Sequence, residues 1–268
     1  MSNWGLFYEK AVREDGSLFF PERLSKEFLE SQRRILGSYI FANQYQNEII
    51  PLEDRVLKPE WLRYYQTIPE RVTTFAFIDP AISQADTADF TGVTIVHCDT
   101  NKTWYLRLAE RKKLTPTEIV SLVFSLHSQF KCHAIGIEDV AYQKALLYMI
   151  HEESLRRNTY PPVKGIHPGT DKTKETRIMG LVPRFEWGHI LINQGQDDFE
   201  KEYLEFPRSS HDDILDSLSQ IEQIAFYPER EQFDDTEPAP NHPQYESWYR
   251  RKLRREAENN PGLEEIGE

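Results

Sequence analysis

The segment VTTFAFIDPAISQADTADFTGVTIVHCD, residues 72–99, decides the fold. Residues 72–79 and 92–99 are rich in β-branched and aromatic side chains, which is typical of strands. A third such run, residues 103–110, follows after only three residues, which is the spacing of a hairpin. We therefore predict that the first three strands of the sheet are antiparallel neighbours.

Helices and strands alternate in the sequence after this hairpin. Thr115, Pro116 and Glu118 have the pattern of a capping box, with proline at the first helical position. The predicted elements that follow are a helix at 115–130, a strand at 133–140, a helix at 143–157 and a strand at 163–166. A helical segment interrupted by Pro183 is predicted at 171–187, then a short strand at 190–193 and a helix from His211. This order predicts an α/β domain with a mixed central sheet and helices on both faces.

Three regions differ in composition. Residues 1–70 are predicted to be a lead-in with helices at 24–36 and 59–65 and an irregular segment between them. Residues 71–228 form the predicted core domain. Residues 229–268 carry eleven acidic and six basic side chains and a Pro-rich, polar stretch, which favours a flexible tail.

The composition excludes few functions. The net charge of −12 argues against a simple electrostatic DNA binder, although the tail alone contributes −5 and bound divalent metal would neutralise clustered carboxylates. Cys98 and Cys132 do not make a disulfide framework or a zinc site. No apolar run approaches the roughly 20 residues that span a bilayer, so we expect no membrane partner.

Acidic residues occur where predicted elements end or begin. Asp79 ends the first strand, Glu138 and Asp139 end the fourth, and Asp212, Asp213 and Asp216 lie in the first turns of the last helix. Oxygen ligands of this kind are what Mg²⁺ and Mn²⁺ prefer. Two such ions about 4 Å apart can activate water and stabilise a leaving oxygen in phosphodiester hydrolysis.

The geometry of strands and helices reduces the number of candidate metal ligands but does not select a single set. Neighbouring strand residues point to opposite faces, so only one of Glu138 and Asp139 should bind metal directly. Asp213 and Asp216 share a helical face, whereas Asp212 is turned away by about 100°. Asp86 and Asp89 are better explained as solvated loop residues. His211 could assist proton transfer or cap the helix, and we favour the cap.

A resemblance to a known family rests on four ordered segments. FAFIDPAISQADTADFTGVTIV, IGIEDVAYQKALL, KTKETRIMGLVPRFEWGHILI and SSHDDILDSLSQ resemble the nuclease domain of large terminase subunits of tailed double-stranded DNA bacteriophages, in order and spacing. The resemblance covers residues 16–227 and implies an RNase H-like, RuvC-like fold. It implies a hydrolase, an endodeoxyribonuclease that cuts concatemeric viral DNA during genome packaging with two Mg²⁺ or Mn²⁺ ions.

The resemblance also implies roles for particular residues. The metal ligands would be Asp79, Glu138 (or Asp139) and Asp212, with Asp213 beside them, while RuvC-type relatives use two acids three residues apart, as Asp213 and Asp216 are. Lys172, Lys174 and Arg177 could be a solvated charged face, but the resemblance favours contacts to DNA phosphates.

The implied partners are double-stranded DNA, a terminase ATPase domain, a small terminase subunit and a portal protein. The implied location is the host cytoplasm and, transiently, the procapsid portal. The phosphate-binding loop of the ATPase is missing from this sequence, so we expect a nuclease fragment or a separately encoded nuclease. The alternatives are a junction resolvase or transposase-type nuclease, and a non-catalytic module that docks on the portal or capsid.

Overall fold

The computed structural model describes residues 8–48, 56–80, 90–138, 143–167 and 173–228, and residues 245–246, 248–250 and 252–253 near the C-terminus. The chain divides after Pro228 into two compact units. In the second unit, the Tyr245 ring stacks on the ring of Tyr249.

The predicted hairpin is confirmed. Strands β1 (Val72–Asp79), β2 (Thr91–Asp99) and β3 (Trp104–Lys112) pair in antiparallel fashion. Strand β4 (Ala134–Glu138) runs parallel to β1, and β5 (Val163–Ile166) runs parallel to β4. Strand β6 (Ile190–Ile192) adds to the far edge, parallel to β3. The resulting order, β5-β4-β1-β2-β3-β6, gives the mixed sheet of an RNase H-like fold.

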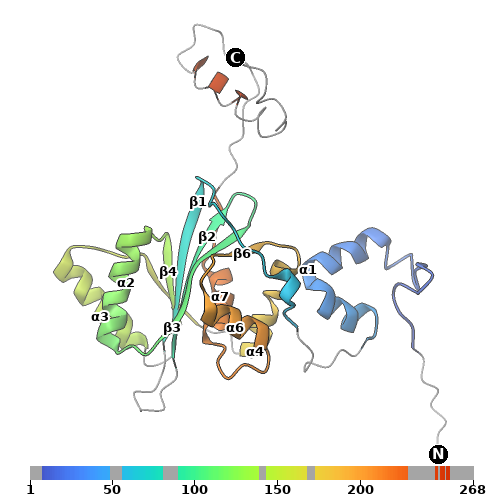
Figure 1. Cartoon of the computed structure of the whole chain (residues 1–268), viewed down its shortest axis with the longest axis horizontal. Coiled ribbons are helices and arrows are strands. Elements are labelled where there is room, and N and C mark those ends of the chain that lie inside the picture. Colours follow the sequence, from blue (N-terminus) through green and yellow to red (C-terminus); the bar gives the residue numbers. More distant parts are fainter. Residues whose placement is uncertain are drawn as a thin grey trace, which may run out of the picture. The chain divides into compact units, whose positions relative to one another are not determined.

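Helices cover both faces of the sheet, as predicted (Figure 1). On one face, Ala76 and Ile78 of β1 pack in a core with helices α2 (Pro116–Phe130) and α3 (Gln143–Arg157). On the other face, Phe75 and Phe77 pack in a second core with α4 (Lys174–Met179), α5 (Val182–Glu186), α6 (Asp197–Glu205) and α7 (Asp213–Gln220). Residues of β1 therefore alternate between the two cores, which is the period-2 pattern of a strand buried on both sides.

The helical predictions are partly corrected. The capping box at Thr115 is present, and Ser25 caps helix α1 (Lys26–Tyr45). However, α1 continues into the segment expected to be irregular, with a kink at Gly37, whose φ of 75° suits glycine. The break in residues 171–187 lies at Gly180 and Leu181, before Pro183 rather than at it.

Two other elements differ from expectation. Residues 59–65 contain only the short 3₁₀ helix η1 (Pro59–Trp61). Helix α6 was not predicted, because the residues it buries, Phe199, Glu202 and Tyr203, include a charged one and so weaken the apolar pattern. In the part of the chain that the structure describes, no helix has the length and apolarity to cross a membrane.

Candidate active site

Asp79 and Glu138 lie at the ends of adjacent parallel strands. The register pairs Ile78 with Ile137, so the next residue of each strand brings the two carboxyl groups to the same edge. Ile135 and Ile137 face the α2–α3 core, whereas Ala134 faces the α7 core. Glu138 therefore shares the parity of Ala134 and projects, like Asp79, toward the face that α7 covers.

The two carboxyl groups interact directly. Burial, together with the charge of Glu138 and a hydrogen bond between the two side chains, raises the pKa of Asp79 well above its usual range. The charge of Asp216 raises this pKa further, and Lys174 opposes the shift. A divalent cation can replace a proton on a carboxyl group whose pKa is raised in this way.

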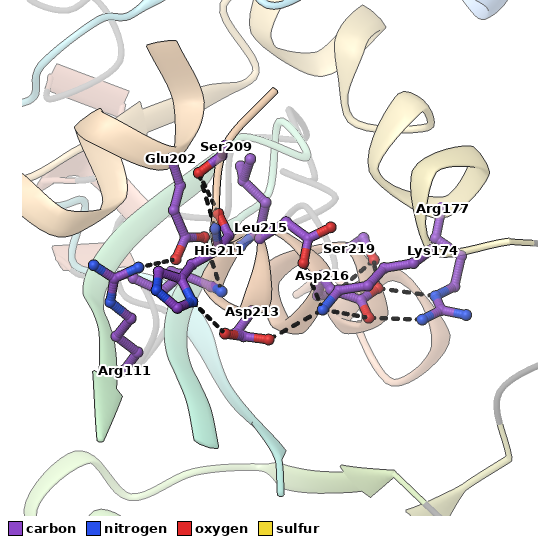
Figure 2. A network of polar contacts seen from close by, with 12 residues as sticks. Arg111, Lys174, Arg177, Glu202, Ser209, His211, Asp213, Leu215, Asp216 and Ser219 are labelled. Atoms are coloured by element: carbon purple, nitrogen blue, oxygen red, sulfur yellow. Dashed lines mark hydrogen bonds and ion pairs between the residues drawn. The ribbon is translucent and has the colours of Figure 1, made fainter. Parts of the chain in front are cut away.

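Helix α7 brings the third group of acids to this face. Figure 2 shows Asp213 and Asp216 on α7 with the Lys174 side chain between them. The Lys174 ammonium lies 2.7 Å from a carboxylate oxygen of Asp212, 3.1 Å from Asp213 and 3.9 Å from Asp216. The charge of Asp216, in the first turn of α7, acts on the carboxyl group of Asp79.

Lys174 and Arg177 hold the α7 carboxylates in place. Arg177 donates from Nε and Nη2 to the two carboxylate oxygens of Asp216, at 2.9 and 2.6 Å, in a bidentate pair (Figure 2). Burial lowers the pKa of Lys174, but the hydrogen bond to Asp212 and the neighbouring carboxylates reverse that effect and raise it. Two of the three cations expected to contact phosphates, eight and eleven residues after the end of β5, are thus already bound to acids.

A buried glutamate, which the sequence reasoning missed, caps α7. Glu202 of α6 accepts hydrogen bonds from the backbone amides of Ile214 and Leu215, at 3.0 and 3.2 Å. Arg111 of β3 donates to the other carboxylate oxygen at 3.3 Å. Asp212, at the N-cap position, makes no side-chain cap. Glu202 therefore satisfies the amides that the start of a helix leaves unpaired.

Gly92 lets α7 approach the sheet, and its role also went unrecognised. Gly92 pairs with Asp79 across β1 and β2. A Cβ at this position would lie 2.8 Å from the carbonyl carbon of Asp213, closer still to its oxygen, and 3.3 Å from the Cβ of Ser217. Ser217 hydrogen-bonds to Thr94 at 2.9 Å and donates to the Phe77 carbonyl at 3.1 Å. These contacts fix α7 against the strand that carries Asp79.

His211 does not cap α7, contrary to expectation, because Glu202 already fills that role. The His211 ring packs edge-on against Phe90, with 5.2 Å between centroids, and its Nδ1 lies 3.9 Å from a carboxylate oxygen of Asp213. Four other residues considered from the sequence lie outside the described residues: Asp86, Asp89, Asp139 and Lys172.

The donor chemistry suits a hard divalent cation, but the arrangement is incomplete. Within the described ranges, no three histidine, cysteine or acidic side chains are grouped so that they could hold one ion. Lys174 lies among the α7 carboxylates and Arg177 holds both oxygens of Asp216. These cations neutralise the acids that a metal would otherwise share with Asp79 and Glu138. The candidate ligand atoms of this site are all carboxylate oxygens, which Mg²⁺ and Mn²⁺ bind readily.

Comparisons with known proteins address the fold. No protein-family model matches the chain, and no curated protein matches it. Among solved structures, the chain resembles the large terminase of a thermophilic bacteriophage, with a TM-score of 0.56 and 13% identity over 76% of this chain and 54% of that one. It also resembles the Mn-soaked nuclease domain of the human cytomegalovirus terminase, with a TM-score of 0.46 and 15% identity over 63% of this chain and 95% of that one.

A third similar structure is the yeast mitochondrial Holliday junction resolvase, with a TM-score of 0.38 and 14% identity over 72% of this chain and 89% of that one. The expected resemblance to large terminases is confirmed at the level of the fold. The likeness spans about half of the bacteriophage terminase. The fold and the site together define an RNase H-like domain in which carboxylates at the ends of two strands face an acidic helix.

Proposed function

We propose that the protein is a metal-dependent endonuclease that cuts concatemeric viral double-stranded DNA during genome packaging. The observation that carries this proposal is the carboxyl pair of Asp79 and Glu138, which meets the acids of α7 at one edge of the sheet. Asp216 of α7 raises the pKa of Asp79, so acids from three separate segments lie near this edge, and a module that only docks on another protein has no need of them.

In this proposal, Asp79, Glu138 and Asp216 bind two Mg²⁺ or Mn²⁺ ions, with Asp213 at the edge of the site. The ions would activate the attacking water and stabilise the leaving oxygen. Asp216 takes precedence over Asp212 as a ligand because its charge raises the pKa of Asp79. Asp139 stays a candidate, although the parity of β4 favours Glu138.

Lys174 and Arg177 would have two tasks. Without metal they neutralise the acids of α7, at distances of 2.6–3.9 Å. With metal bound, the acids have a stronger counter-charge, and the two cations become free to contact the phosphates on either side of the cut. Lys172 belongs to the same proposed contact.

The packaging role and the partners rest on the shared fold with a large terminase. We propose that the nuclease acts together with a terminase ATPase domain, a small subunit and a portal protein, in the host cytoplasm and at the procapsid. Assayed without the ATPase that would deliver DNA, this chain should have weak intrinsic activity.

Plasmid digestion tests the proposal. We expect nicking and linearisation with Mn²⁺ or Mg²⁺, none with EDTA, and none by Asp79→Ala with either metal. Asp197→Asn, an exposed acid of α6, is the matched control and should cut like wild type. Undiminished cutting by Asp79→Ala would refute the assignment. Preferential cutting of a four-way junction over linear duplex would instead favour a resolvase.

A further inference from the structure

A groove of about 1160 Å³ lies beside the acidic site. Its walls come from α1, from α4 and α5, from the turn between β2 and β3, and from the end of α7 with the 3₁₀ helix η2 (Ile221–Gln223). None of the residues assigned to metal binding lines it. The proposed metal site therefore does not account for this groove.

The groove carries positive charge in a chain whose net charge is −12. Arg34, Lys102 and His189 lie on it and are exposed. Among the described residues that line it, Glu222 is the single acid, and Arg184 binds that acid at 2.8 Å. In the part of the chain that the structure describes, Arg34 and Lys102 form no ion pair. The Lys102 ammonium lies 5.9 Å from the centroid of the Tyr227 ring, so its charge is not neutralised there by an acid, and both cations can attract an anionic ligand.

Two further residues suit the recognition of a base. The Trp187 side chain lines the groove and is 42% exposed, which is high for an indole in a folded domain. Gln220 also lines it and is only 1% exposed, yet its Nε2 has no hydrogen-bond partner. A buried amide donor without a partner costs free energy, unless a ligand supplies the acceptor.

One end of the groove borders the acidic site. Arg177 lines the groove and holds Asp216 in the bidentate pair. Ser219 also lines it and donates to the backbone carbonyl of Asp216 at 2.6 Å. The groove therefore runs from the residues that contact Asp216 toward the turn between β2 and β3, which lies at the Val72 end of β1.

We propose that this groove binds an unpaired DNA strand next to the cut. The inference rests on the proposed function for the identity of the polymer. Arg34 and Lys102 contact backbone phosphates, a base stacks on Trp187, and Gln220 hydrogen-bonds to a base edge. The bases of an intact duplex are stacked inside it and cannot reach an indole, whereas unpaired bases stack on aromatic side chains regardless of sequence.

The proposal is tested by binding, without metal. A fluorescein-labelled oligo(dT) is titrated with the full chain in EDTA, and its anisotropy is measured across a range of salt concentrations. We expect Trp187→Ala to weaken binding by about tenfold, the scale of one lost base–aromatic stack. Arg34→Glu and Lys102→Glu should each lower the salt-dependence slope by about 0.7, the value for one phosphate contact on a single strand.

Matched controls separate the groove from general surface effects. Tyr148→Ala removes an exposed aromatic ring on α3, and Lys201→Glu reverses an exposed charge on α6; neither residue lines the groove, and both variants should bind like wild type. Oligo(dT) should also quench tryptophan fluorescence in wild type but not in Trp187→Phe. A blunt duplex should bind with little dependence on Trp187.

The two proposals fail in different ways. If Trp187→Ala, Arg34→Glu and Lys102→Glu all bind oligo(dT) like wild type, the groove assignment is wrong, whatever the nuclease assay shows. If those variants lose binding while Asp79→Ala still cuts DNA, the groove binds a strand and the proposed catalytic site is wrong.

Discussion

Gly92 and Asp213 are in such close contact that a single added carbon at Gly92 would collide with the backbone of Asp213. Because Gly92 is also the strand partner of Asp79, this contact sets the distance between the strand acid and the helix acids. The absence of a side chain at Gly92 is therefore part of the geometry of the proposed metal site.

Gly92→Ala tests this relationship. The added methyl group meets backbone, which cannot rotate away, so α7 must shift or the strand must bend. We expect a loss of about 1–3 kcal/mol in the free energy of unfolding and a larger loss of metal-dependent cleavage. Urea unfolding and plasmid nicking measure the two effects.

Gly136→Ala is the matched overpacking control. Its Cβ would collide with the ring of Phe77 and approach Ile224 instead of α7. It should lose stability to a similar extent while keeping more activity per folded molecule. Equal loss of activity in the two variants would mean that Gly92 has no special role.

Asp79→Asn should separate stability from function. The raised pKa of Asp79 means that folding favours its protonated form, so ionisation of this group costs stability as the pH rises through its folded pKa. Asparagine removes that cost. We expect the metal-free variant to have a higher Tm than wild type at pH 8, and to lose cleavage. A lower Tm for a correctly folded Asp79→Asn would contradict the strained acid pair.

Glu202 should impose its own pH dependence on stability. Burial raises the pKa of Glu202 from 4.5 to about 7, and the backbone hydrogen bonds and Arg111 only partly oppose this shift. Its contribution to stability is complete below pH 4.5 and is lost as the pH rises through 7, a change of about 3 kcal/mol. The unfolding free energy of wild type relative to Glu202→Gln should therefore fall over this window, whereas parallel pH profiles would rule the effect out.

Arg177→Met should make the protein depend on metal for stability. The substitution keeps much of the side-chain volume but leaves Asp216, whose side chain is 3% exposed, without its bidentate partner. We expect a loss of about 3 kcal/mol, the cost of an unpaired buried charge. A divalent cation can replace the lost charge, so Mn²⁺ should raise the Tm of this variant more than that of wild type. Equal Mn²⁺ shifts in thermal denaturation would argue against a metal at Asp216.

Local sequence patterns predicted most of the sheet, because strands and caps are encoded by neighbouring residues. The run at 72–99 and the capping box at Thr115 behave as expected. The parity of β4 could also be anticipated, since a strand alternates between its faces wherever it lies. Those features give the face to which Glu138 points, but the parallel pairing of β4 with β1, which brings Glu138 beside Asp79, is a tertiary contact that the sequence did not predict.

The choice among the α7 acids could not be predicted in this way. Which of Asp212, Asp213 and Asp216 faces Asp79 depends on how α7 lies on the sheet, and contacts between distant residues set that placement. Gly92 opens the space, and Glu202 caps the helix from another helix. The pairing of Lys174 with the acids is likewise a tertiary contact, between residues 39 apart in the case of Asp213.

Calorimetric titration of Mn²⁺ into wild type and Asp79→Asn at pH 8 tests the central claim most directly. Bound metal must compete with protonation of Asp79, whose pKa is raised, so wild type should bind about two ions per chain and release protons into the buffer. Asp79→Asn should lose at least one of these ions. Binding of the same number of ions with unchanged affinity by Asp79→Asn would contradict a metal site at the ends of β1 and β4.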